Sequence, residues 1–237
     1  MQLLVSVRDA IEAAVALEAG AHIVDAKEPD RGPLAAVDPE VLAAITQRLP
    51  ASTPISAALG EPADVGALEQ ALACRCAALL HHPAYVKFVI PALAPDVLAA
   101  CVAATRAAVP HARVVLATYA DRSEAPLVEV ARLVGTAGAD GVLVDTASKG
   151  RSLLDIVPAA VLEAFVGMGH ASGLFVALAG SLSAEDLPRV AALGADVAGV
   201  RGAACDGGRN ARLSGLRVRA LRLVVERGPR ARAALSS

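Results

Sequence analysis

Short apolar runs alternate with longer amphipathic segments along the whole of this 237-residue chain. The apolar runs are rich in β-branched residues, as buried strands are, and they cover residues 3–7, 22–27, 55–59, 85–90, 113–120, 141–146, 174–179 and 197–200. The amphipathic segments have the length of helices, and they cover residues 9–19, 39–48, 64–80, 95–108, 126–136, 154–168, 183–193 and 211–227. Eight strand–helix units predict an α/β fold, a (β/α)8 TIM barrel in a single domain spanning residues 1–237.

A doubly wound open sheet is the alternative architecture for such an alternation. Open sheets that bind dinucleotides carry a G-x-G-x-x-G turn after the first strand, and no such turn follows Val7 here. The barrel is therefore the preferred prediction. The last ten residues follow the final predicted helix, and we expect them to be frayed.

The composition limits both the core and the partners. The chain is 55% hydrophobic but only 2% aromatic and has no Trp, so its core must consist of closely packed Ala, Val and Leu. A net charge of −2 without a basic face argues against nucleic-acid binding. No segment reaches the roughly 18 apolar residues that a membrane span needs, and none resembles a signal peptide. We expect neither a nucleic-acid nor a membrane partner.

The cysteines and histidines do not suggest a metal site. Cys74, Cys76, Cys101 and Cys205 lack CxxC spacing, so we expect free thiols in a reducing, cytoplasmic environment. The five histidines lack the spacing of metal ligands, and the chain has neither a Walker loop nor a G-x-S-x-G motif. We therefore expect a protein that needs no metal and no cofactor.

Lysine is rare in this chain, because only Lys27, Lys87 and Lys149 occur among its 22 Lys and Arg residues. Each lies in or just after an apolar run, where a solvated charge is least expected. Unlike Arg, a lysine in a dry pocket can lose its proton and act as a nucleophile or a base. Asp25 stands two residues before Lys27, on the same face of a strand, and Asp145 stands four residues before Lys149. The alternative is that the three lysines are solvated charges at strand ends.

The barrel topology predicts where these side chains meet. Catalytic residues of (β/α)8 barrels lie at the carboxyl ends of the strands. The candidates all occupy such ends or lie close to them: Asp25, Lys27, Lys87, Asp145, Lys149 and, as a further possibility, Asp121. Lys87 reaches the barrel axis if its neighbours Val86 and Phe88 face the helices.

The seventh and eighth predicted strands end in small residues, in the runs Ala179-Gly180-Ser181 and Arg201-Gly202-Ala203. Small residues let backbone N–H groups approach an anion, and helix N-termini add positive potential. We therefore predict that one substrate phosphate binds at Gly180, Ser181, Gly202 and Ala203, and that Arg201 is a candidate ligand for a second phosphate. The alternative is two tight turns that bind nothing.

Two or three amines, two carboxylates and a phosphate cradle together suggest Schiff-base chemistry on a sugar phosphate. One desolvated lysine would attack a carbonyl group, and a second cation would lower its pKa further. An Asp or another Lys would transfer protons. We expect a small-molecule sugar phosphate as substrate, and a homo-oligomer, because Ala-rich helices can pack against copies of themselves.

The same residues resemble the (5-formylfuran-3-yl)methyl phosphate synthases, also called 4-(hydroxymethyl)-2-furancarboxaldehyde-phosphate synthases. The resemblance covers nearly the whole chain, and its motifs are Leu3-Leu4-Val5-Ser6, Asp25-Ala26-Lys27-Glu28-Pro29, Gly32-Pro33-Leu34, Tyr85-Val86-Lys87, Tyr119-Ala120-Asp121 and Asp145-Thr146-Ala147-Ser148-Lys149. Its most specific stretches are residues 176–181 and 199–205. The segment after Gly60 and the Arg-rich C-terminus depart from the family pattern, and both lie away from the predicted site.

The resemblance implies a (β/α)8 barrel and a lyase of methanofuran biosynthesis. Two molecules of glyceraldehyde 3-phosphate would condense to a phosphorylated furan aldehyde, with loss of one phosphate and of water. The family's Schiff-base lysine falls on Lys27 and its proton-acceptor lysine on Lys87, and its further Lys and Asp residues fall on Lys149, Asp25 and Asp145. The product would serve a methanofuran-type cofactor in one-carbon metabolism.

Two other functions remain open at this point. A class I aldolase acting on another sugar phosphate could use the same lysine and the same phosphate site, because loop shape sets the substrate. A non-catalytic barrel that binds a phosphorylated metabolite is the third hypothesis. The lysines argue against this last function, because an unpaired buried charge costs several kcal/mol and needs a reason.

Overall fold

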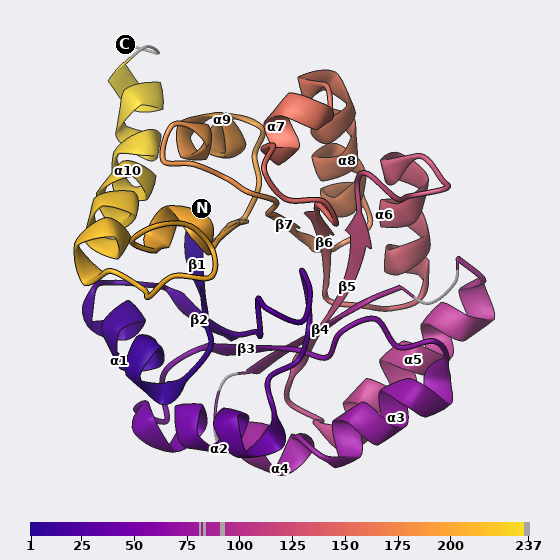
Figure 1. Ribbon diagram of the computed structural model, residues 1–237. Helices are drawn as coiled ribbons and strands as arrows, with labels where there is room; N and C mark the ends of the chain where they lie inside the picture. The colour runs from indigo at the N-terminus through magenta and orange to yellow at the C-terminus, as the bar shows by residue number, and fades with distance from the viewer. Residues whose placement is uncertain (81, 83, 91–92, 235–237) are drawn as a thin grey trace.

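The structure, a computed structural model, describes residues 1–80, 82, 84–90 and 93–234. Its centre is a closed parallel barrel in which each strand pairs with the next in the chain and the last pairs with the first (Figure 1). The strands are β1 (Gln2–Val7), β2 (Ile23–Ala26), β3 (Ile55–Ala58), β4 (Ala84–Val89), β5 (Arg113–Tyr119), β6 (Gly141–Asp145), β7 (Phe175–Leu178) and β8 (Val197–Val200). The predicted (β/α)8 barrel is confirmed, and the open sheet is excluded.

Helices form a ring around this barrel (Figure 1). They are α1 (Ala10–Glu18), α2 (Pro39–Arg48), α3 (Val65–Ala73), α4 (Cys76–Leu79), α5 (Pro95–Ala108), α6 (Leu127–Thr136), α7 (Leu153–Ile156), α8 (Ala159–Ala171), α9 (Asp186–Ala192) and α10 (Gly215–Ala234), with a short 3-10 helix, η1 (Gly202–Ala204). None of the helices in the described ranges is long and apolar enough to span a membrane. The four cysteines are free thiols, as predicted.

Two predicted helices are each divided in two. The segment 64–80 breaks between α3 and α4, where Arg75 turns its guanidinium back to the carbonyl oxygen of Val37. The segment 154–168 breaks before Pro158, because a residue that precedes proline is forced out of the helical region. Val157 accordingly has an extended backbone, with φ −117° and ψ 124°.

The last helix also differs from the sequence prediction. It begins at Gly215, later than expected, and α10 continues as far as Ala234. The expectation that the last ten residues are frayed stays a prediction, and residues 235–237 lie outside the described residues.

Alternation along the strands separates two apolar layers. Val86 and Phe88 pack outward into the main core between barrel and helices, while Tyr85 belongs to a smaller cluster inside the barrel. Lys87 therefore faces the barrel interior, as the parity argument required. The outer layer is tight because its residues are small. A Cβ on Gly169 of α8 would lie 2.4 Å from Val176 Cγ2 of β7, so only glycine allows this helix to pack so closely.

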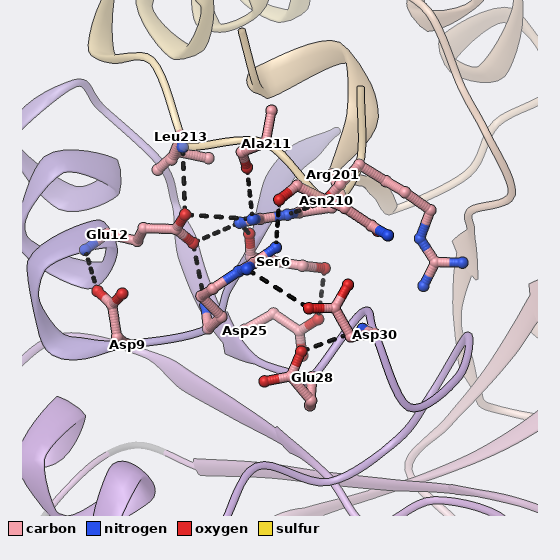
Figure 2. Close-up of polar contacts among 12 residues, drawn as sticks. Ser6, Asp9, Glu12, Asp25, Glu28, Asp30, Arg201, Asn210, Ala211 and Leu213 are labelled. Atoms are coloured by element: carbon pink, nitrogen blue, oxygen red, sulfur yellow. Dashed lines mark hydrogen bonds and ion pairs between the residues drawn. The ribbon is translucent and has the colours of Figure 1, made fainter. Parts of the chain in front are cut away.

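A buried ion pair joins the end of β8 to α1. Arg201 donates from Nη1 and Nη2 to the two carboxylate oxygens of Glu12, and both side chains are almost completely buried. The remaining guanidinium hydrogens go to the carbonyl oxygens of Ser6, Arg209 and Ala211, at 2.9–3.0 Å. Figure 2 shows Arg201 between Glu12 and the segment that leads into α10. This network ties both edges of the barrel closure, β1 and β8, to the C-terminal segment.

Removing Glu12 should be far more damaging than removing a surface charge. Glu12→Ala leaves the Arg201 guanidinium buried without a counter-ion, which costs about 3–5 kcal/mol. For a chain of this size that corresponds to a melting temperature roughly 10 °C lower, measurable by calorimetry. Arg132→Ala is the matched control, because its pair with Glu129 is exposed and solvent screens it. Equal melting temperatures for the two variants would contradict this assignment.

Candidate active site

A cavity of about 330 Å³ opens at the carboxyl ends of the strands. Apolar side chains such as Leu4, Ile23, Val115 and Leu143 line part of it. The cavity also brings together most of the predicted site residues, namely Lys27, Lys87, Lys149, Asp145, Gly180, Ser181, Arg201, Gly202 and Ala203. The rim predicted from the strand ends therefore exists as one site.

Asp25 lies beneath this cavity and is completely buried. Its Oδ1 pairs with Lys87 Nζ at 2.7 Å, and its Oδ2 accepts a hydrogen bond from Ser6 Oγ at 2.8 Å. The parallel register places Ser6 directly beside Asp25, which explains this contact. Burial alone would raise the pKa of Asp25, but the charges of Lys87 and Lys27 and the two hydrogen-bond donors hold it below its ordinary value.

Lys149 belongs to the loop after β6 and pairs with the carboxylate at the end of that strand. Its Nζ lies 2.8 Å from Asp145 Oδ1 and 2.5 Å from the carbonyl oxygen of Thr146. Asp145 Oδ1 also accepts from the Thr146 backbone N–H at 2.7 Å. The side chain of Lys149 is 22% exposed, more than those of the other two lysines, so its amine remains in contact with solvent.

Asp121 acts on this loop from outside the cavity. Its carboxylate accepts hydrogen bonds from the backbone N–H groups of Ala147 at 2.7 Å and Ser148 at 2.8 Å. The side chain is exposed and does not line the cavity. We therefore assign Asp121 the role of holding the loop that carries Lys149, in place of the direct role that its strand-end position suggested.

Lys27 differs from the other two lysines because no carboxylate in the described ranges pairs with its amine. Its residue is only 8% exposed. Burial lowers the pKa of Lys27 from 10.5 to about 8, and the positive charges of Lys87 and Lys149 lower it too, against the opposing effect of Asp145 and Asp25. At pH 7 a pKa of about 8 leaves roughly a tenth of this amine uncharged, and the uncharged form is the one that attacks carbonyl carbon.

The turns after β7 and β8 present free backbone donors to the same cavity. In the part of the chain that the structure describes, the N–H groups of Ser181, Leu182, Gly202 and Ala203 make no hydrogen bond. Gly180 and Ser181 both have positive φ, at 110° and 50°, and Ser181 is the one described non-glycine residue with this backbone. Four such donors at one rim are an arrangement that can accept an anion.

Arg201 is not available to this arrangement. All five N–H donors of its guanidinium are used by Glu12 and by three backbone carbonyl groups. This corrects the prediction that Arg201 binds a second phosphate, and we assign it to barrel closure. Arg209 takes its place as the candidate. It lines the cavity, donates from Nη2 to the carbonyl oxygens of Pro29 at 2.7 Å and Gly32 at 3.2 Å, and pairs with no carboxylate among the described residues.

Sequence reasoning missed three polar residues of the site, Ser6, Ser56 and Arg209. Ser6 and Ser56 lie beside Asp25 in the strand ladders, so strand register would have found them once β1, β2 and β3 were aligned. Arg209 lies in an irregular loop, and no periodic signal points to it. Within the described residues, no cluster of three His, Cys, Asp or Glu side chains could hold a metal ion.

With this geometry in place, the chain can be compared with known proteins. Residues 3–222 match the model of a family described as 4-HFC-P synthase. The chain belongs to this family. It is similar to the (5-formylfuran-3-yl)methyl phosphate synthase of Methanopyrus kandleri, at 39% identity over 87% of this chain and 90% of the relative. The enzyme of the same name from Methanocaldococcus jannaschii is 35% identical over 88% of this chain and 92% of the relative.

Solved structures with the same architecture are more distant in sequence. A 3-hexulose-6-phosphate synthase from Salmonella typhimurium has a TM-score of 0.66 at 19% identity, covering 96% of this chain and all (100%) of that one. KGPDC from Streptococcus mutans has a TM-score of 0.64 at 15% identity, covering 95% of this chain and 97% of that one. At these identities the likeness supports the barrel fold and no more.

The low pKa of Lys27 can be measured directly, because the chain has only three lysines. In protein whose lysines carry a carbon-13 label at Cε, one NMR signal should titrate with a midpoint near pH 8, and Lys27→Met should remove that signal. Unfolded lysine keeps its proton up to about pH 10.5, so the charged amine destabilises the folded state fully below about pH 8 and progressively less above it. The stability gained by Lys27→Met should therefore shrink between these two values. A midpoint of about 10 or above for Lys27 would contradict the assignment.

Proposed function

We propose that this protein is a lyase that condenses two molecules of glyceraldehyde 3-phosphate to (5-formylfuran-3-yl)methyl phosphate, with loss of phosphate and water. The observation that carries the proposal is the Lys27 amine, buried, without a carboxylate partner in the described ranges, and with a pKa lowered to about 8. Family membership over residues 3–222 supports the same activity. The product would enter the synthesis of a methanofuran-type cofactor.

Lys27 is the nucleophile in this proposal. Its uncharged Nζ attacks the aldehyde carbon of one substrate molecule, the carbonyl oxygen leaves as water, and an imine links enzyme and substrate. The imine acidifies the adjacent C–H bond, because its nitrogen can accept the electron pair that the departing proton leaves behind.

Lys87 and Lys149 are the proton carriers. Lys87 Nζ lies 2.7 Å from Asp25 Oδ1, and Lys149 Nζ lies 2.8 Å from Asp145 Oδ1, so a buried carboxylate orients each amine. A general acid or base held in this way commonly accelerates a step by about 10²–10⁴-fold. The greater exposure of Lys149 also suits a role in neutralising the phosphate that departs.

The phosphate of the imine-bound molecule would lie on the four free N–H groups of the β7 and β8 turns. The second molecule would place its phosphate toward Arg209, which lacks a carboxylate partner within the described ranges. A class I aldolase on another sugar phosphate would use the same lysine and turns, and it differs only in its product. A binding protein without catalysis leaves the cost of a buried unpaired amine without a purpose.

The decisive experiment is incubation of the purified chain with glyceraldehyde 3-phosphate. The proposal expects furan absorbance to grow together with inorganic phosphate, in equal amounts. Imine formation without furan would favour the aldolase, which a panel of sugar phosphates would then identify. Binding of the substrate without imine or product would contradict both the synthase and the aldolase functions.

Arginine should fail to replace the first two lysines in this assay. Guanidinium stays protonated at working pH, so it can neither attack a carbonyl group nor accept a proton. Lys87→Arg should lose about 10²–10⁴-fold in turnover, and Lys27→Arg at least as much, with circular dichroism unchanged. Lys149→Arg should keep more activity than either, if its charge is what matters. Near-normal rates for all three variants would rule out the Schiff-base mechanism.

A carboxylate placed at the β8 turn should repel the substrate phosphate. A side chain fits there, because a Cβ on Gly202 would lie 3.7 Å from the nearest neighbouring atom, Arg209 N. Gly202→Asp should therefore fold and raise KM by roughly 10-fold or more, since like charges at close range oppose binding. Gly202→Ala is the control for size and should stay close to wild type. Equal KM values for the two variants would place the phosphate elsewhere.

A further inference from the structure

Ser56 of β3 carries a buried hydroxyl group that the described residues leave without a hydrogen-bond partner. The residue is 1% exposed and lines the cavity together with Lys27 and Lys87. A buried polar atom of this kind costs free energy unless something binds it, so each case calls for an explanation. Ser56 is therefore a buried polar residue in the wall of the cavity.

Ser6 and Ser56 differ in whether their hydroxyl groups have a hydrogen-bond partner within the protein. Both serines lie beside Asp25 in the ladder, Ser6 on β1 and Ser56 on β3. Asp25 accepts a hydrogen bond from Ser6 Oγ at 2.8 Å and forms an ion pair with Lys87 Nζ at 2.7 Å. Ser56 makes no hydrogen bond to this carboxylate, although it stands beside Asp25 in the strand register.

The substrate in the proposed function has three polar groups, namely an aldehyde, a hydroxyl group on C2 and a phosphate. The aldehyde carbon is bound by Lys27, and the phosphate by the free N–H groups after β7 and β8. The C2 hydroxyl group, next to the imine carbon, is the substrate group that still lacks a partner, in a cavity that Leu4, Ile23 and Val115 partly line. A hydroxyl group moved from water into such surroundings needs a partner.

We propose that Ser56 is a substrate-contacting residue whose hydroxyl group hydrogen-bonds the C2 hydroxyl of the molecule bound at Lys27. This inference rests on the proposed function, because it takes the imine at Lys27 as given. The proposed hydrogen bond joins the Ser56 hydroxyl group, which lacks a partner in the described residues, to the C2 hydroxyl group of the substrate. Either group can donate or accept, so the pair is satisfied whichever direction the bond takes. Ser56 thereby selects 2-hydroxyaldehydes over simple aldehydes.

The test crosses Ser56→Ala with a substrate that lacks the C2 hydroxyl group, 3-phosphooxypropanal. The measured quantity is the rate at which borohydride traps the imine on Lys27, read by mass spectrometry. With glyceraldehyde 3-phosphate, Ser56→Ala should slow trapping about 10-fold, because the substrate hydroxyl is then buried unpaired. With 3-phosphooxypropanal, wild type and Ser56→Ala should trap at the same rate. Equal effects on both substrates, or no effect on either, would overturn the inference.

Ser6→Ala is the matched control, since it removes the other serine that flanks Asp25. Its hydroxyl group is bonded to Asp25 within the protein, so its loss should lower the melting temperature and slow trapping equally with both substrates. Ser56→Ala should leave the melting temperature unchanged or raise it, because it removes an unsatisfied group. If wild-type enzyme traps neither substrate, the imine itself is absent, and the proposed function fails together with this inference. If wild type traps both substrates but Ser56→Ala slows trapping of both by the same factor, only the inference fails.

Discussion

Two buried carboxylates share three amines at the mouth of this barrel. Asp25 neutralises Lys87 and Asp145 neutralises Lys149, which leaves the Lys27 amine without a partner in the described residues. Desolvation, together with the positive charges of Lys87 and Lys149, brings the pKa of Lys27 down to about 8. Had a third carboxylate been present, the amine would be held in its charged form and would be useless as a nucleophile. The proposed chemistry depends on this excess of one amine over the two carboxylates.

The barrel supports this difference between the lysines by keeping water away from Lys27 and Lys87. Apolar side chains fill the barrel interior below the lysines, and a second, larger apolar layer lies between the strands and the helices. The small side chains of that layer let the helices approach closely, as Gly169 does against Val176. A chain with almost no aromatic residues can in this way build a rigid and dry barrel.

Barrel closure and the active site are joined through one residue. Ser6 offers its carbonyl oxygen to Arg201 and its hydroxyl group to Asp25, so the network that seals β8 against β1 also orients the carboxylate beneath Lys87 (Figure 2). Arg201 also donates a hydrogen bond to the carbonyl oxygen of Arg209, and the Arg209 side chain donates to the carbonyl oxygen of Pro29 in the loop that follows Lys27. Movement at the closure would therefore disturb Lys87 and the rim of the cavity together. This coupling gives a physical reason to keep a costly buried ion pair in the fold.

The sequence by itself determined the strands, the three suspect lysines, and the small residues after β7 and β8, whereas the structure decided that Lys87 faces inward. The first three features follow from local periodicity and from side-chain chemistry, which need no tertiary information. Only the tertiary structure decided the pairing. Asp25 shares a strand face with Lys27, yet it bonds to Lys87 of β4, because packing two strands away set the distance. Tertiary contacts also took Arg201 out of the site, accompany the break in the helix predicted over residues 64–80, and left the Ser56 hydroxyl unpaired. All of these depend on which atoms meet across strands and loops far apart in the chain, and local sequence does not encode such distances.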